Sequence, residues 1–352
     1  MPAPPFETTT RRLVLRRPTE ADRDFHARVH SDPRLYTHAP HVVGTPETNA
    51  AFFARILAHW EEHGFGYWVA EDRESGMPLG WVGVQRGDAY LNLYYRFVVE
   101  AQGRGLAREA GRAAVGMATE WGPQLPVRAL VKGHNTASVR TALASGLADT
   151  GREVVLADDR ADEPSSLVFE APQLERVDLL DAGTREELLD LWQRVNDAGG
   201  AVGFLPGAPR EDVAAAAARH EEQMAAGNAV AGALRDPDGT LLGWGWWVRS
   251  ENPLLHHGRW LYRLMVDPER QGRGLGLVLL AGLHRLARQE GAEVLVLSVR
   301  SGSGASRLYR QVGYVEVGRI PGAIRVGEGD DRDDITMARR VDGGALVAHG
   351  GD

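Results

Sequence analysis

A glycine-containing hexapeptide occurs twice in this chain of 352 residues, starting at Gln102 and, 169 residues later, at Gln271. The copies read Gln102-Gly103-Arg104-Gly105-Leu106-Ala107 and Gln271-Gly272-Arg273-Gly274-Leu275-Gly276. An apolar run precedes each copy, and an Ala-, Leu- and Arg-rich stretch typical of a helix follows it. A strand, a glycine turn and a helix start form an anion site, because glycine permits close backbone approach and the first helical N–H groups face the anion. The repeat therefore predicts two phosphate-binding units.

Two further landmarks flank both copies in the same order. Leu79-Gly80-Trp81 corresponds to Leu242-Gly243-Trp244, and Ser145-Gly146-Leu147 corresponds to Val312-Gly313-Tyr314. Each Leu-Gly-Trp follows a hairpin turn signal, Ser75-Gly76 or Asp238-Gly239. A repeat of this length indicates homologous domains rather than solenoid units. We expect an N-terminal domain at 1–171, a C-terminal domain at 172–342 and a flexible tail at 343–352.

Hydrophobic periodicity predicts the same alternation of strands and helices in both halves. A first helix is expected to start at 18–22, with Thr19 as its cap, and another to run from the first glycine turn to Trp121. Further helices are expected at 49–62, 137–145, 184–196, 213–224, 275–290 and 305–312. Thr184 and Glu187 are spaced as a capping box. Strands are expected at 12–16, 67–71, 79–85, 90–98, 127–132, 167–170, 174–179, 230–235, 241–248, 259–266, 294–299 and 335–338. This order is typical of α/β domains, each built around one mixed sheet.

Composition narrows the function classes. The chain has no cysteine, which excludes disulfides, thiolate metal sites and cysteine nucleophiles, and we expect no bound metal. Its net charge of −8 argues against nucleic acid as the main partner. No stretch approaches the roughly 18 apolar residues that a membrane helix needs. The residues from Met1 to Pro5 lack the basic start and apolar centre of a secretion signal. We therefore expect a cytoplasmic protein, monomeric or homodimeric, without a membrane partner.

Both hexapeptides fit the Gln/Arg-x-x-Gly-x-Gly/Ala pattern, and the chain resembles the GCN5-related N-acetyltransferase (GNAT) superfamily in tandem. The resemblance implies two GNAT-fold domains, acetyl-CoA as cofactor, and fourth and fifth strands that splay apart. It also implies that the turn amides hold the pyrophosphate and that the pantetheine arm pairs with the open strand edge. The implied cofactor residues are Val98, Gln102, Gly103, Arg104, Gly105, Leu106, Ala107, Asn135, Val266, Gln271, Gly272, Arg273, Gly274, Leu275 and Gly276.

The first half resembles the ribosomal-protein alanine acetyltransferases. Its opening strand at 11–16 and the run from Asn135 to Ser138 carry the resemblance. In that branch the asparagine contacts the cofactor and the serine is a proposed proton donor, so the roles pass to Asn135 and Ser138. A helix cap is the structural alternative for Ser138. Val99 stands where that branch usually has proline, and Leu147 where it usually has an aromatic residue.

The second half resembles the tabtoxin-resistance type of acetyltransferase and related antibiotic-modifying enzymes. The matching segments are 202–206, 308–314 and 318–321. The resemblance makes Tyr309 the general acid, whereas Ser298 occupies the position of the family's strand aspartate. The pairing of an active with a cofactor-binding domain in mycothiol synthase is a similar architecture.

Acetyl transfer from a thioester requires a neutral amine, a base, donors for the oxyanion and an acid for the thiolate. Backbone amides near Val98 or Val266 are candidate oxyanion donors. The sequence leaves four candidates for the general base, namely Glu251, His256, His257 and a chain of waters. Trp244 and Trp246 share a strand face and either pack in the core or form an aromatic wall for a cationic substrate.

These observations predict an acetyl-CoA-dependent N-acetyltransferase that acts on the primary amine of a small metabolite or antibiotic-like molecule. The C-terminal domain is expected to be catalytic, with Tyr309 as acid and with Trp244, Trp246, Glu251 and Ser298 near the substrate. The alternatives are protein N-terminal acetylation by the first domain through Ser138, and a non-catalytic acetyl-CoA-binding module.

Overall fold

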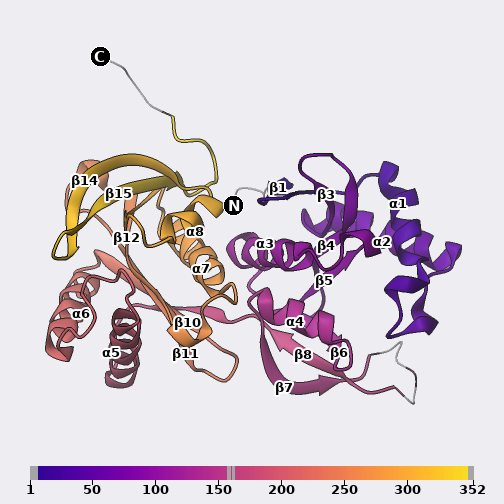
Figure 1. Cartoon of the computed structure of the whole chain (residues 1–352), viewed down its shortest axis with the longest axis horizontal. Helices are drawn as coiled ribbons and strands as arrows, with labels where there is room; N and C mark the ends of the chain where they lie inside the picture. Colours follow the sequence, from indigo (N-terminus) through magenta and orange to yellow (C-terminus); the bar gives the residue numbers. More distant parts are fainter. Residues whose placement is uncertain (1–6, 157–159, 161–162, 348–352) are drawn as a thin grey trace. The chain divides into compact units, whose positions relative to one another are not determined.

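The structure is a computed structural model that describes residues 7–156, 160 and 163–347 (Figure 1). The chain forms two compact units, Met1–Pro172 and Gln173–Asp352. The sequence placed the boundary between residues 171 and 172, one position before this division. Of the expected tail at 343–352, residues 348–352 lie outside the described part of the chain.

The first unit contains four α-helices among its described residues, with short 3-10 turns between them. The helices are α1 (Arg23–His30), α2 (Pro46–His63), α3 (Leu106–Trp121) and α4 (Thr136–Ala144). The strands are β1 (Glu7–Thr9), β2 (Leu13–Arg16), β3 (Tyr67–Asp72), β4 (Pro78–Arg86), β5 (Leu91–Phe97), β6 (Val127–Lys132), β7 (Ala148–Val154) and β8 (Ser166–Glu170).

The second unit repeats this order of elements. Its helices are α5 (Ala182–Asp197), α6 (Arg210–Ala225), α7 (Leu275–Gln289) and α8 (Ala305–Gln311). Its strands are β9 (Gln173–Val177), β10 (Ala229–Arg235), β11 (Leu241–Val248), β12 (Gly258–Val266), β13 (Val294–Arg300), β14 (Val315–Gly327) and β15 (Asp330–Arg340).

Each unit is built around one mixed sheet, and the two sheets have the same topology. The first sheet runs β1-β2-β3-β4-β5-β6-β8-β7, and the second runs β9-β10-β11-β12-β13-β15-β14 when read from its other edge. Without β1, every strand of the first sheet has a counterpart in the second at the same place. The expected mixed α/β fold and the internal repeat are therefore confirmed.

The fourth and fifth main strands separate in both units. In the second unit β12 and β13 pair in parallel only from Gly258–Leu261 to Val294–Leu297, although β12 continues to Val266 and β13 to Arg300. In the first unit the parallel pairing of β5 and β6 is limited to Leu91 and Asn92. Both sheets thus have the expected splay, which leaves backbone groups open beyond the last parallel pair.

The central strand β11 of the second unit is buried along its whole length. Trp244 and Trp246 pack in the core formed with α5 and α6, whereas Trp247 donates its indole N–H to the Leu283 carbonyl of α7 at 2.7 Å. Helices therefore cover both faces of this sheet (Figure 1). No helix of the described residues is both long and apolar enough to cross a membrane.

Two local predictions were wrong. The side chain that caps α5 is Asp181, which accepts from the backbone N–H of Thr184 at 2.8 Å, so the Thr184–Glu187 spacing is no capping box. The strands β1, β7 and β14 were not predicted from the sequence. Most β14 side chains are exposed, and such a strand carries little hydrophobic alternation.

Candidate active site

The two repeated glycine turns have the same backbone conformation. The φ angles are +70° at Gly103 and +73° at Gly105, and +77° at Gly272 and +95° at Gly274. Residues with a Cβ rarely adopt this left-handed region, which explains the glycines. Gly105 is the N-cap of α3 and Gly274 that of α7, so the first N–H groups of both long helices point out of the turn.

The glutamine of each hexapeptide fastens its turn to the preceding strand. Gln102 donates its side-chain amide to the Phe97 carbonyl at 3.2 Å, and Gln271 donates to the Val266 carbonyl at 3.4 Å. Their side chains therefore hold the turn in place.

Both turns fit a phosphate group. A Cβ placed on Gly103 or Gly272 would meet no atom within 4 Å, so the space beside these two backbones is open. A Cβ on Gly105 would lie 3.8 and 3.9 Å from the guanidinium groups of Arg12 and Arg108. Arg104 and Arg273 add positive charge within the two turns. Leu106 and Leu275, which begin the helices, are buried and anchor them, while Ala107 and Gly276 follow in the first helical turn.

In the first unit Ser138 is hydrogen-bonded to a half-buried tyrosine, Tyr95. The Tyr95 hydroxyl lies 3.0 Å from the Ser138 Oγ and donates to the Ser138 carbonyl at 2.8 Å. Burial raises the pKa of Tyr95 to about 12, although the hydrogen bond with Ser138 opposes this. Asn135 is the N-cap of α4 and accepts from the Ser138 backbone N–H at 3.1 Å. The capping role considered for Ser138 therefore belongs to Asn135.

In the second unit Tyr309 lies on α8 with only 8% of its surface exposed. Its ring makes an edge contact with Tyr314, at 5.7 Å between centroids. Burial raises the pKa of Tyr309 well above its usual range, so the hydroxyl keeps its proton at neutral pH. The adjacent Leu308 packs beside Gly276, where a Cβ would come within 3.3 Å of it, and this contact holds α8 against the start of α7.

The candidate acids of the two units are not equivalent residues. The offset of 169 residues that relates the hexapeptides also relates Thr136 and Ala305, the first residues of α4 and α8. At this offset Ser138 corresponds to Arg307, and Tyr309 corresponds to Arg140. Each unit thus lacks the candidate proton donor of the other.

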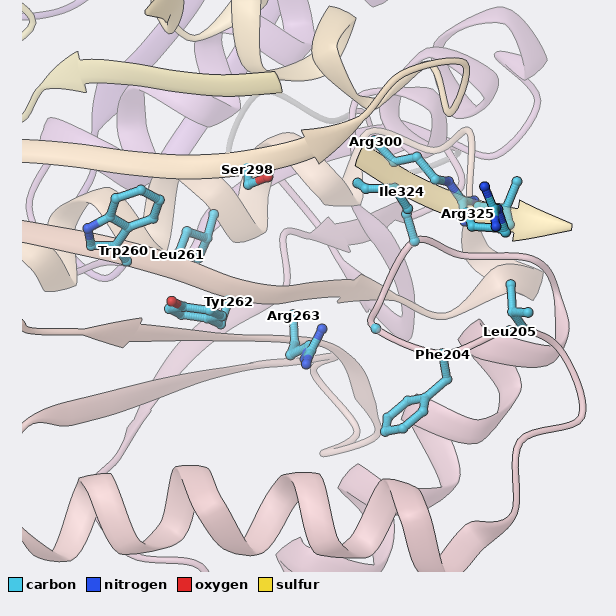
Figure 2. A pocket seen from close by; sticks show the side chains of 13 residues that line it. Phe204, Leu205, Trp260, Leu261, Tyr262, Arg263, Ser298, Arg300, Ile324 and Arg325 are labelled. Atoms are coloured by element: carbon cyan, nitrogen blue, oxygen red, sulfur yellow. The ribbon is translucent and has the colours of Figure 1, made fainter. Parts of the chain in front are cut away.

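A cavity of about 370 Å³ lies in the second unit where β12 and β13 separate (Figure 2). Trp260, Tyr262 and Arg263 of β12 and Ser298 and Arg300 of β13 line two of its sides. The loop between α5 and α6 contributes residues from Ala201 to Leu205, and β14 contributes Ile324, Arg325 and Val326. The cavity therefore opens beside the splayed strands.

Ser298 connects the cavity to a carboxylate behind it. Its hydroxyl donates to the Asp334 carboxylate of the neighbouring strand β15. The register pairs Ser298 with Thr336 and Arg300 with Asp334, which places all four side chains on one face of the sheet. The sequence reasoning missed Asp334, because only the pairing of β13 with β15 connects it to Ser298.

Trp244 and Trp246 do not line the cavity, so their assignment to the substrate was wrong. Both are fully buried, because α5 and α6 cover their side of β11. Phe204, Trp260 and Tyr262 are the aromatic residues that line it, and the two on β12, Trp260 and Tyr262, are 36% and 41% exposed. Trp260 and Tyr262 flank the buried Leu261, an alternation present in the sequence.

The amide of Val98 is not available as an oxyanion donor, because it already donates to the Leu79 carbonyl at 2.9 Å. Val266 lies at the end of β12, opposite Gly243. Glu251, His256 and His257 are exposed between β11 and β12 and line no part of the cavity. No group of three or more potential metal ligands occurs among the described residues.

Family models match both units. The Acetyltransferase (GNAT) domain is matched by residues 12–148 and, in a second model of the same description, by residues 211–321. Together the matches cover more than half of the chain. The chain belongs to the GNAT acetyltransferases. It is therefore an acyltransferase, and GNAT acetyltransferases use acetyl-CoA as acyl donor.

Solved structures of acetyltransferases resemble parts of this GNAT protein. An acetyltransferase from Agrobacterium tumefaciens is 26% identical, covers 47% of this chain and matches over 94% of its own length, with a TM-score of 0.40. A ribosomal-protein-alanine N-acetyltransferase from Brucella melitensis is 19% identical and covers 47% of this chain and 98% of its own, with a TM-score of 0.40. The resemblance of the second half to the tabtoxin-resistance type stays a prediction.

Proposed function

We propose that this GNAT protein transfers an acetyl group from acetyl-CoA to the primary amine of a small metabolite or antibiotic-like molecule, and that the second unit is catalytic. The observation that carries the proposal is the cavity beside the splay of β12 and β13, which is lined by Ser298, the hydrogen-bond donor to Asp334. The first unit keeps its glycine turn and is proposed to bind acetyl-CoA as well.

Asp334 is the proposed base. A primary amine is protonated at neutral pH and must lose a proton before it attacks a thioester. Ser298 lines the cavity and already donates its hydroxyl proton to Asp334, so an amine proton can pass to the carboxylate through the serine oxygen. This assignment replaces Glu251, His256 and His257, which neither line the cavity nor have a side-chain hydrogen bond, among the described contacts, to a residue that lines it.

Tyr309 is the proposed acid. In the transfer the amine nitrogen bonds to the acetyl carbon, the carbon–sulfur bond breaks, and the thiolate takes a proton. A phenol with a raised pKa remains protonated throughout the neutral range and can supply that proton. Its place on α8, beside the helix that begins at the second glycine turn, supports this role.

Release of free thiol from acetyl-CoA, measured across a panel of acceptors, tests the proposal. The panel contains amino acids, aminoglycosides and polyamines, and peptides that begin with alanine. The expected result is turnover of small amines that is abolished by Tyr309→Phe in the second unit. Acetylation of peptides alone, lost in Ser138→Ala, would place the chemistry in the first unit.

The second candidate function is protein N-terminal acetylation by the first unit. The hydrogen-bonded pair of Tyr95 and Ser138 favours it, because a coupled tyrosine and serine can move a proton. The peptide arm of the same panel tests this alternative.

A further inference from the structure

Arg263 has an exceptional backbone conformation within the cavity wall. Its φ angle of +53° makes it the one non-glycine residue with positive φ in the described part of the chain. It lies at an irregularity of β12, where the register with β11 shifts between Trp244 and Trp246. Such strain persists where the surrounding structure enforces it, and it is concentrated at functional sites. The irregularity turns the Arg263 side chain into the cavity beside Tyr262 and Phe204 (Figure 2).

The Arg263 guanidinium has no acidic partner. None of the described carboxylates forms an ion pair with it, and its Nε is buried without a hydrogen-bond partner. The guanidinium carbon lies 5.4 Å from the centroid of the Trp192 ring, and the group packs so closely on Gly203 that a Cβ there would collide with it. Burying a cation without a partner costs free energy, so a ligand that supplies the missing charge would recover it.

A second arginine strengthens the positive charge of the cavity. Arg300 makes one long hydrogen bond, of 3.4 Å, to the Gly199 carbonyl. Asp334 lies opposite it in the strand register, but the described structure shows no ion pair between them. Arg325, the third lining arginine, differs because it is paired with Asp331 at 2.7 Å. The cavity thus presents two guanidinium groups that lack a carboxylate partner among the described residues.

We infer that Arg263, with Arg300, binds a carboxylate of the acetyl acceptor, and that the acceptor is an amino-acid-type amine rather than a polycationic one. This inference rests on the proposed function of the second unit and adds the class of substrate. Planar guanidinium groups bind carboxylates with two parallel hydrogen bonds. Trp260 and Tyr262 then offer apolar surface to the rest of the acceptor, and Ser298 faces its amine. A polycation would instead be repelled by both arginines.

Matched acceptors test the inference. Thiol release is compared for the proteinogenic L-amino acids, their methyl esters, the corresponding carboxyl-free amines and kanamycin. The acids preferred by the enzyme should exceed their esters by at least roughly 30-fold in kcat/KM, the effect of losing one partner of a desolvated charge pair. The esters have the less basic amines and thus more free base, so chemistry alone would favour them.

Variants of Arg263 test whether this arginine causes the preference for acids over esters. Arg263→Gln should lower kcat/KM for the acids by roughly 30-fold or more and leave that for the esters within about threefold. Arg263→Lys keeps the charge but loses the forked guanidinium, so its kcat/KM for the acids should lie between those of Arg263→Gln and the unaltered protein. Arg210→Gln removes an exposed positive charge at the start of α6 that lines no part of the cavity, and it is the matched control with little expected change. The melting temperature of Arg263→Gln should not fall, because no ion pair is lost.

Each outcome separates the inference from the proposed function. Turnover of esters or kanamycin as fast as acids would overturn the inference and leave the proposed function standing. An increase in KM for acetyl-CoA instead of the acceptor in Arg263→Gln would place this arginine at the cofactor and also overturn it. If no small amine is turned over, the proposed function fails. Calorimetric titration with the same acids and esters then decides the inference, since binding of acids alone supports it and equal or absent binding overturns it.

Discussion

The Ser298 hydroxyl of β13 donates to the Asp334 carboxylate of β15, and this contact connects an acid to a side chain that lines the cavity where the sheet splays. In the proposed mechanism the neighbouring strand therefore supplies the base through Ser298.

Asp334→Asn tests the base. The amide cannot take the amine proton, so kcat at neutral pH should fall by roughly 10²- to 10⁴-fold, the usual range for general catalysis. Activity of the variant should recover partly at high pH, where more of the amine is already the free base. Steady-state kinetics of Asp334→Asn and of Ser298→Ala, measured from pH 6 to 10, check the loss of kcat and its recovery. An unchanged kcat in Asp334→Asn would remove Asp334 from the mechanism.

Much of the fold was predictable because its signals are local. A glycine turn between an apolar run and a helix, and the hairpin turns at Gly76 and Gly239, each depend on a few consecutive residues. They recur in the same order at similar spacing, which predicted two homologous domains. The missed strands were β1, β7 and β14, whose side chains are all exposed or half-buried.

The candidate site was less predictable because it depends on contacts between distant residues. Ser298 and Asp334 meet through strand pairing across 36 positions, and no spacing rule connects them. The error over Trp244 and Trp246 has the same origin, since alternation shows which residues share a face but not which helices cover it. The conformation of Arg263 follows from a register shift that no sequence pattern indicates.

Tyr309→Phe and Ser138→Ala identify the catalytic unit. If Tyr309 protonates the thiolate, its loss should lower turnover of small amines by roughly 10²- to 10⁴-fold. Cofactor affinity should change little, because one neutral hydrogen bond contributes about 1 kcal/mol. Ser138→Ala should leave turnover of small amines unchanged. Thiol release and calorimetry with acetyl-CoA measure both quantities. Turnover of Tyr309→Phe within twofold of the unaltered protein would exclude Tyr309 as the acid.

The two glycine turns predict two acetyl-CoA molecules per chain. Gly105→Val and Gly274→Val should each remove one site, because both glycines are helix N-caps and a side chain there obstructs the approach of the phosphate to the first helical N–H groups. Both substitutions also strain a left-handed backbone. Gly76→Val and Gly239→Val, at φ angles of +72° and +90° in hairpin turns, carry the same strain outside the site and should keep both molecules. Isothermal titration counts the sites, and one site in the unaltered protein would show that a unit has lost the cofactor.

The buried histidines of the first unit predict loss of stability in acid. The His26 and His30 rings stack at 4.0 Å between centroids in a core with Phe52, Phe53 and Trp81, and both His26 nitrogens lack a hydrogen-bond partner. Burial, aided for His26 by the nearby His30 and Arg23, lowers the pKa of His26 to about 3; burial also lowers that of His30 to about 4. The ordinary pKa of a histidine side chain, which applies to the unfolded chain, is 6.5.

The sign follows from the protons that each state binds. Between pH 6.5 and about 4 the unfolded histidines are protonated and the folded ones are not, so the free energy of unfolding falls as the pH falls through this window. Thermal unfolding of the full chain at a series of pH values should show a transition that moves to lower temperature below pH 6.5. His26→Leu replaces an unpaired polar ring by an apolar side chain and should weaken that dependence, whereas His256→Gln, at an exposed position of the second unit, should preserve it. A transition in His26→Leu with the same pH dependence as in the unaltered protein would mean that His26 contributes nothing to it.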